Sequence, residues 1–336
     1  MAALLLDPGG PGSPHGQRLA EDSTGPRHRT VPGANLGRLW EHPAVQQNPD
    51  LRPWWLRALA ALPLPVLYAT TTGLMFIVYR VLRHRVARVA AQIAACFPDR
   101  RPAEVRAMVT AHYYQVADII AEAVKAAHWT REQMAERVEM VNLALPQGLL
   151  AEGKPVLLVA AHQANWEWVL HALALHLGHP LDVGYKPIKA PWAQRMMYAI
   201  RTRFGAHLVP AKELLADMLK RRSIVRGIAM LGDQEPLHDS QKHWTTFLGR
   251  ETAFYMGAEQ MSRATRYAGV FVAMRRKRRG WYQIEFYPIA GHGERLEPGE
   301  FTERYARHVE REILAAPQDW TWGHKRWKLR RNLYEA

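Results

Sequence analysis

A single histidine stands directly after an apolar run that has the length of a buried strand. Residues 155–161, PVLLVAA, carry no charge, His162 follows them, and Glu167 comes five positions later. In open α/β sheets the reactive groups lie beyond the carboxyl ends of the strands. We therefore predict that His162 lies at the functional edge of a sheet, and we interpret His162 and Glu167 as a candidate catalytic pair.

A carboxylate beside this imidazole would control where its protons lie. Asn165 is placed to cap the next helix, which puts Glu167 in the first turn, where the helix dipole favours an ionised carboxylate. Such a carboxylate can keep one ring nitrogen protonated and leave the other free to accept a proton. The pair would suit the deprotonation of an alcohol. Taken alone the spacing is a weak signal, because the chain has 16 histidines and most histidines serve other roles.

The sequence offers no clear protein nucleophile and no clear metal site. A G-x-S-x-G motif is missing, and the only cysteine, Cys96, lies far before the strand and helix region. The substrate's own hydroxyl is therefore the expected nucleophile. There is no H-E-x-x-H motif, and a spacing of five on a helix turns two side chains roughly 140° apart. We expect neither a metal nor a cofactor.

Alternating strands and helices must position these residues. Short apolar runs at 155–161, 181–187, 206–210 and 227–231 alternate with helical segments that end near 177, 203 and 222. This pattern predicts an α/β fold, with a largely parallel or mixed sheet flanked by helices. Further elements are predicted as a core helix at 103–126, a helix from about 252, a hairpin around the basic segment 275–280, and an amphipathic helix at 301–313.

The chain before this domain divides into two segments. Residues 1–50 are rich in Gly, Pro and Ser and are predicted to be a disordered leader. Residues 54–80 are predicted to form an N-terminal transmembrane helix, since 58–79 contain no charge and aromatic and arginine residues flank them. The basic C-terminal flank places the remaining domain, 81–330, in the cytoplasm. Pro63 and Pro65 leave open a kinked or interfacial helix, or a hydrophobic element docked on the domain.

Charge and cysteine content narrow the possible partners. The formal net charge is +14, which favours an anionic partner such as a membrane surface, an acidic protein or nucleic acid. The basic residues lie in separate loops and no nucleic-acid-binding motif occurs, so a membrane-anchored nucleic-acid binder is the remote alternative. A single cysteine excludes an intramolecular disulfide framework.

Six sequence blocks resemble one enzyme family. The segment AAHQANWEW is similar to the His-Gly/Ala-Asn-Trp-Glu block of the bacterial lipid A biosynthesis late acyltransferases, the lauroyl and myristoyl transferases. The same family order continues in the segments GYKPIKAPWAQRMM, IRTRFGAHLVP, MLGDQEP, TTFLGRETAF and DWTWGHKRWK. The resemblance covers roughly residues 55–329. Two positions depart from the family pattern, Lys186 in place of Arg and Leu248 in place of Phe.

The resemblance implies a function and a set of site residues. The fold would be similar to that of glycerolipid acyltransferases, and a fatty acyl chain would pass from acyl carrier protein to a hydroxyl of a lipid A precursor at the cytoplasmic face of the inner membrane. His162 would be the general base and Glu167 its orienting partner. The implied substrate-binding residues are Asn165, Trp166, Lys186, Arg201, Asp233 and Gln234. Another glycolipid acceptor, such as a mannosylated phosphatidylinositol, and a non-catalytic family member stay open as alternatives.

Overall fold

The centre of the molecule is a seven-stranded sheet. The computed structural model describes residues 52–331, so the predicted leader at 1–50 lies outside the described residues. The strand order is β1-β9-β8-β2-β5-β3-β4, and every neighbouring pair is parallel except β8 with β9. These strands are β1 (Val138–Met140), β2 (Val156–Ala160), β3 (Leu181–Tyr185), β4 (His207–Pro210), β5 (Gly227–Leu231), β8 (Ala268–Arg278) and β9 (Trp281–Ala290). The predicted mixed, mostly parallel α/β sheet is confirmed.

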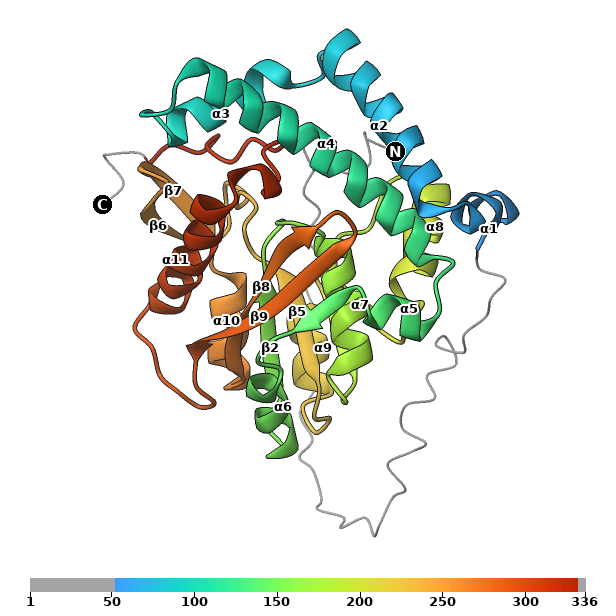
Figure 1. Cartoon of the computed structure of the whole chain (residues 1–336). Coiled ribbons are helices and arrows are strands. Elements are labelled where there is room, and N and C mark those ends of the chain that lie inside the picture. Colours follow the sequence, from blue (N-terminus) through green and yellow to red (C-terminus); the bar gives the residue numbers. More distant parts are fainter. Residues whose placement is uncertain (1–51, 332–336) are drawn as a thin grey trace, which may run out of the picture.

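Helices flank this sheet, and a small hairpin lies beside it (Figure 1). The hairpin pairs β6 (Lys242–Phe247) with β7 (Arg250–Tyr255). The helices after the N-terminal segment are α3 (Val86–Cys96), α4 (Pro102–Ala126), α5 (Arg131–Ala135), α6 (Ala144–Ala151), α7 (Trp166–His176), α8 (Pro191–Arg201), α9 (Leu214–Lys220), α10 (Gly257–Thr265), α11 (Glu300–Ala315) and the 3₁₀ turn η5 (Pro317–Asp319).

Strand β2 is the central element because it is buried on both faces. All five of its residues are buried. Leu157 and Val159 belong to one hydrophobic core, whereas Val156, Leu158 and Ala160 belong to the other. Side chains alternate across a strand, so each face of β2 packs on its own layer of helices. The uninterrupted apolar run before His162 is the sequence signature of this double burial.

The register of the sheet brings two predicted site residues to one edge. In the parallel pair of β2 and β5, Ala160 lies opposite Leu231. His162 and Asp233 each follow these paired residues by the same number of positions. Parallel neighbours end at the same edge of a sheet, so the two side chains emerge next to one another.

Residues 54–80, predicted as one helix, do not form a continuous helix in the structure. The segment is divided into α1 (Trp54–Ala61), α2 (Leu64–Phe76) and a π-helical turn η4 (Ile77–Val81). The break lies at Leu62, which has an extended ψ of 147 before Pro63. A proline disfavours the helical conformation of the residue that precedes it, which explains the break. The stretch Leu64–Val81 is still long and apolar enough to cross a membrane, and 22% of it is buried.

Two further predictions differ from the structure near the C-terminal half. The helix predicted from about 252 begins only at α10, since residues 250–255 form β7. The hairpin that contains β7 turns at Leu248 and Gly249, both with positive φ, and a leucine there gives no recognisable turn signal. The hairpin predicted around 275–280 is confirmed, but most of its basic residues lie within β8.

Candidate active site

His162 and Asp233 form a directly bonded pair at the edge of the sheet. His162 Nδ1 lies 2.7 Å from Asp233 Oδ1, and the backbone N–H of His162 donates to Asp233 Oδ2 at 3.0 Å. Asp233 is fully buried, whereas the His162 side chain is 16% exposed. The carboxylate therefore holds the imidazole from inside the protein, and the second ring nitrogen is left on the accessible side.

The surroundings of Asp233 keep its carboxyl group ionised. Burial alone would raise its pKa, but the charge and hydrogen bond of His162, the nearby His324 and the Trp320 indole outweigh burial, so the pKa lies well below the usual range. Trp320 Nε1 donates to Asp233 Oδ2 at 2.8 Å. An ionised Asp233 accepts a hydrogen bond from the N–H at Nδ1. In the neutral imidazole, Nε2 is then the nitrogen that can accept a proton.

The free side of His162 faces Gln234 and Trp166. Gln234 Nε2 lies 3.3 Å from His162 Nε2, and its side chain is exposed. A neutral Nε2 can accept a hydrogen bond from this amide. The Trp166 ring centroid lies 5.6 Å from that of His162. These predicted site residues are therefore brought together around one imidazole nitrogen.

Glu167, predicted as the orienting partner of His162, is not hydrogen-bonded to either ring nitrogen of that histidine. Its carboxylate instead accepts two hydrogen bonds from Arg201, from Nε at 2.9 Å and from Nη2 at 2.6 Å. Burial would raise the pKa of Glu167, but the Arg201 charge and hydrogen bonds lower it overall. From the first turn of α7, Glu167 points toward Arg201 at the end of α8, while the ring nitrogens of His162 bond to Asp233 and Gln234.

Asn165 caps α7 as predicted, and a buried carboxylate holds the cap. Asn165 Oδ1 accepts from the backbone N–H of Trp168 at 3.1 Å, while its Nδ2 donates to Glu122 Oε2 at 2.6 Å. Glu122 also accepts from the hydroxyls of Tyr68 and Tyr282. Sequence reasoning missed Glu122, because its position within the core helix α4 carries no mark of this role.

The C-terminal segment runs beside the His162 loop and pins it. Thr321 donates to the His162 carbonyl oxygen from its backbone N–H and its hydroxyl, each at 3.0 Å. The backbone N–H of Ala164 donates to the Asp319 carbonyl at 2.9 Å, in a left-handed turn where Ala164 has φ 48. Trp320 belongs to the block DWTWGHKRWK near the end of the chain. It is fully buried, and it also supports Asp233.

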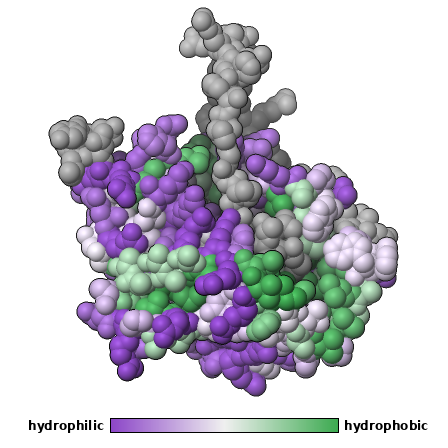
Figure 2. All heavy atoms as spheres, turned by 90° about the horizontal axis from the view of Figure 1, so that it is seen from above, coloured by the Kyte–Doolittle hydropathy of each residue, from purple (hydrophilic) through white to green (hydrophobic). Residues whose placement is uncertain are grey.

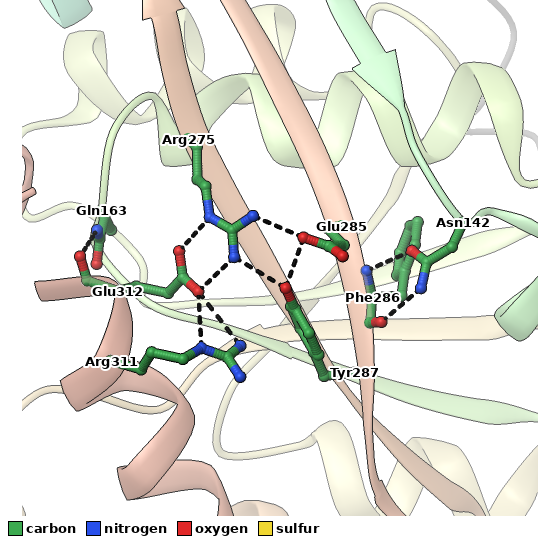
Figure 3. Close-up of polar contacts among 8 residues, drawn as sticks. All are labelled: Asn142, Gln163, Arg275, Glu285, Phe286, Tyr287, Arg311 and Glu312. Carbon is green, nitrogen blue, oxygen red and sulfur yellow. Dashed lines mark hydrogen bonds and ion pairs between the residues drawn. The ribbon is translucent and has the colours of Figure 1, made fainter. Parts of the chain in front are cut away.

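A polar network fixes the same loop from the other side (Figure 3). Gln163 Nε2 donates to the backbone carbonyl of Glu312 at 2.9 Å. The Glu312 carboxylate, 4% exposed, accepts two hydrogen bonds from Arg275, at 2.6 and 2.7 Å. Arg275 donates in turn to Glu285 at 2.6 Å. Helix α11 is thereby tied to β8 and β9, which keeps the anchor of the His162 loop in a fixed position.

The remaining chemical candidates are Lys186, at the same carboxyl edge of the sheet, and Cys96, in a hydrophobic core. Lys186 follows β3, on the far side of β5 from β2, and its side chain is exposed. Cys96 is buried in a hydrophobic core, and burial raises the pKa of its thiol to about 11, so it stays protonated near neutral pH. Within residues 52–331, no group of three or more His, Cys, Asp and Glu is placed to hold a metal ion.

Comparisons with known proteins agree on one enzyme family. The model of a family described as "Bacterial lipid A biosynthesis acyltransferase" matches residues 52–329. The chain is 25% identical over 284 residues to the "Lipid A biosynthesis lauroyltransferase" of Escherichia coli (strain K12), which covers 82% of this chain and 89% of that protein. It is 20% identical over 238 residues to the "Lipid A biosynthesis acyltransferase" of Haemophilus influenzae, covering 70% and 73% respectively.

Proposed function

Because the chain belongs to the bacterial lipid A biosynthesis acyltransferase family and is an acyltransferase, we propose that it moves a fatty acyl chain from acyl carrier protein to a hydroxyl of a lipid A precursor, with His162 as general base. The observation that carries this proposal is the His162–Asp233 pair, 2.7 Å apart at the carboxyl edge of the sheet. The names of the two relatives support a lipid A precursor over other glycolipid acceptors.

The reaction proceeds in two proton-coupled steps. The acceptor oxygen attacks the thioester carbonyl carbon while His162 Nε2 takes the hydroxyl proton, which produces a tetrahedral oxyanion and an imidazolium. The oxyanion collapses, the carbon–sulfur bond breaks with its electron pair on sulfur, and the imidazolium returns the proton to the thiolate. The products are an ester and the free carrier thiol. No acyl-enzyme forms, because the acceptor hydroxyl is the nucleophile.

Asp233 has the orienting role in this mechanism. It keeps the proton on Nδ1 in the resting enzyme and stabilises the imidazolium that forms when Nε2 is protonated. Its low pKa supports this role, since the carboxyl group stays ionised throughout. Glu167 then acts indirectly, as a positioning residue that holds Arg201.

Gln234 is our candidate for stabilising the oxyanion. Its amide nitrogen lies 3.3 Å from His162 Nε2 in the free protein. When the acceptor hydroxyl takes over that hydrogen bond, the exposed amide is released next to the reacting carbon. An amide donor aimed at a developing oxyanion lowers the barrier because its dipole is already in position.

The test is the mass spectrum of lipid A from a strain that lacks this protein. The strain is complemented with the wild type, with His162→Ala, or with the matched control His292→Ala, which changes an exposed histidine away from the site. We expect one secondary acyl chain to disappear in the null strain and to return with the wild type and the control only. Identical lipid A in all four strains would reject this acceptor. Restoration by His162→Ala would reject the base.

A further inference from the structure

The apolar N-terminal segment packs along the side of the catalytic domain instead of projecting from it. Helix α2 and the turn η4 together cover the 18-residue stretch Leu64–Val81. At ~1.5 Å per residue this stretch is roughly 27 Å long, close to the ~30 Å of hydrocarbon in a bilayer. Its buried face is formed by Leu67, Tyr68, Met75 and Tyr79. In Figure 1, α2 lies against α4 on the side away from the sheet.

Polar groups of the domain hold this segment along most of its length. Near its start, the Tyr68 hydroxyl donates to Glu122 Oε1 at 2.6 Å. In its middle, Arg279 Nη2 donates to the Thr72 hydroxyl at 3.2 Å. Near its end, the Tyr79 hydroxyl lies 2.9 Å from that of Thr110. The contacts on α4 therefore run from residue 122 back to residue 110, antiparallel to α2.

This packing is incompatible with a membrane-crossing α2. If the docked segment crossed a bilayer, the adjacent groups of α4, β8 and the β8–β9 turn would enter the hydrocarbon with it. Those groups include Asp118 and its ion-pair partners Arg276 and Arg279, which are 23% and 46% exposed. Charged groups at the centre of a bilayer are costly. The docked α2 must therefore remain at the same depth as the surface of the domain.

The outer face of the segment has the composition of a membrane-binding surface. Its exposed side chains are Leu62, Val66, Leu74, Phe76, Ile77, Val81 and Leu82, and Trp54 precedes them with 80% of its side chain exposed. Residues 52–98 contain six arginines and no acidic residue. Figure 2, which views this side of the molecule, shows hydrophobic surface beside hydrophilic surface. Apolar side chains together with arginines suit the boundary between acyl chains and anionic headgroups.

We infer that α2 and η4 lie in the plane of an anionic leaflet, with the outer face inserted and both ends of the chain on the same side of the membrane. This differs from the transmembrane helix predicted from the sequence. The inference rests on one part of the proposed function, that the protein acts at a membrane. It does not depend on which residue is the general base. A small apolar cavity lined by Met75, Val78, Trp166 and Thr321 lies between this segment and the His162 loop.

The direct test is the position of the N-terminus. A tag carrying one cysteine is fused before Met1, or Leu314, 56% exposed on α11, is changed to Cys, each in a Cys96→Ser background. Intact spheroplasts and lysed membranes are treated with a membrane-impermeant maleimide. We expect both cysteines to react only after lysis. Reaction of the N-terminal tag in intact spheroplasts, with Leu314→Cys still protected, would establish a crossing helix and overturn the inference.

A second test addresses the inserted face. Purified full-length Leu74→Glu and Val81→Glu are expected to bind phosphatidylglycerol vesicles roughly tenfold more weakly each. The matched control Leu314→Glu, which exchanges an exposed leucine outside this surface, is expected to bind like the wild type. Unchanged vesicle binding of the first two variants would contradict insertion. If the wild type were a dimer and these variants became monomers without losing vesicle binding, the outer face would be a contact between two copies, which would also contradict insertion. Acyl transfer measured in detergent micelles tests the proposed chemistry separately.

Discussion

Asp233→Asn is the substitution that most sharply separates the two possible orienting carboxylates. Asp233 Oδ2 accepts from the His162 backbone N–H at 3.0 Å and from Trp320 Nε1 at 2.8 Å, and Oδ1 bonds to His162 Nδ1 at 2.7 Å. An asparagine can keep its oxygen at the Oδ2 position, so both buried donors remain satisfied. Its amide group then faces Nδ1 and donates to it. The imidazole is forced into the tautomer that carries its proton on Nε2, where the base must be free.

The expected loss of rate follows from this reversed tautomer. In a His–Asp pair of this kind the change to asparagine lowers turnover about 10⁴-fold, and we expect about 10³- to 10⁴-fold here. At 1.36 kcal/mol for each factor of ten, this is about 4–5 kcal/mol of transition-state stabilisation. The stability of the fold changes less, by about 1–2 kcal/mol, because neutral hydrogen bonds replace charge-assisted ones.

The assay is the rate of acyl transfer by purified full-length protein, with acyl carrier protein as donor and saturating acceptor. Thermal unfolding is measured on the same samples. The reasoning would be refuted if Asp233→Asn kept at least one-tenth of the wild-type rate while Glu167→Gln lost a thousandfold. That outcome would return the orienting role to Glu167.

Two further predictions concern buried carboxylates. Glu167→Gln leaves the Arg201 guanidinium, 19% exposed, without its counter-charge, and should lower the free energy of unfolding by about 3 kcal/mol in urea titrations. Arg201→Gln should lower it by a similar amount. A loss below about 0.5 kcal/mol would contradict the claim that the two side chains hold each other in place. Burial raises the pKa of Asp319 to about 6, partly offset by Arg276, so its ionisation destabilises the fold as pH rises from about 4 to about 6. Asp319→Asn should therefore raise the free energy of unfolding by about 2–3 kcal/mol at pH 7 and leave it unchanged below pH 4. An equal effect at both pH values would argue against burial of an ionised Asp319 as the cause.

Local features of the site could be predicted from the sequence. The uncharged run before His162 reflects a strand buried on both faces, and Asn165 has the residue type and position of a helix cap. Both depend on neighbours within a few residues. Pro63 and Pro65 also indicate a kinked helix or an element docked on the domain, but the sequence does not identify α4 as the helix that receives it.

The pairing of the site residues could not be predicted from the sequence. Asp233 reaches His162 only because β5 lies next to β2, and the order of parallel strands leaves no local trace. Trp320 comes to Asp233 from a segment near the C-terminus. Glu167 is close to His162 along the chain, which favoured a contact between them, but its place in the first turn of α7 turns it toward Arg201.

The most direct test of the central claim is the rate of acyl transfer by purified His162→Ala. This substitution removes the proposed base and leaves Asp233, Gln234 and the hydrogen bonds of the His162 backbone in place. Removal of a general base predicts a loss of at least about 100-fold at saturating acceptor. The protein is expected to stay folded with a lowered unfolding temperature, because the buried Asp233 carboxylate loses its bonded partner. A folded His162→Ala protein that transfers acyl groups within fivefold of the wild-type rate would contradict the claim that His162 is the base.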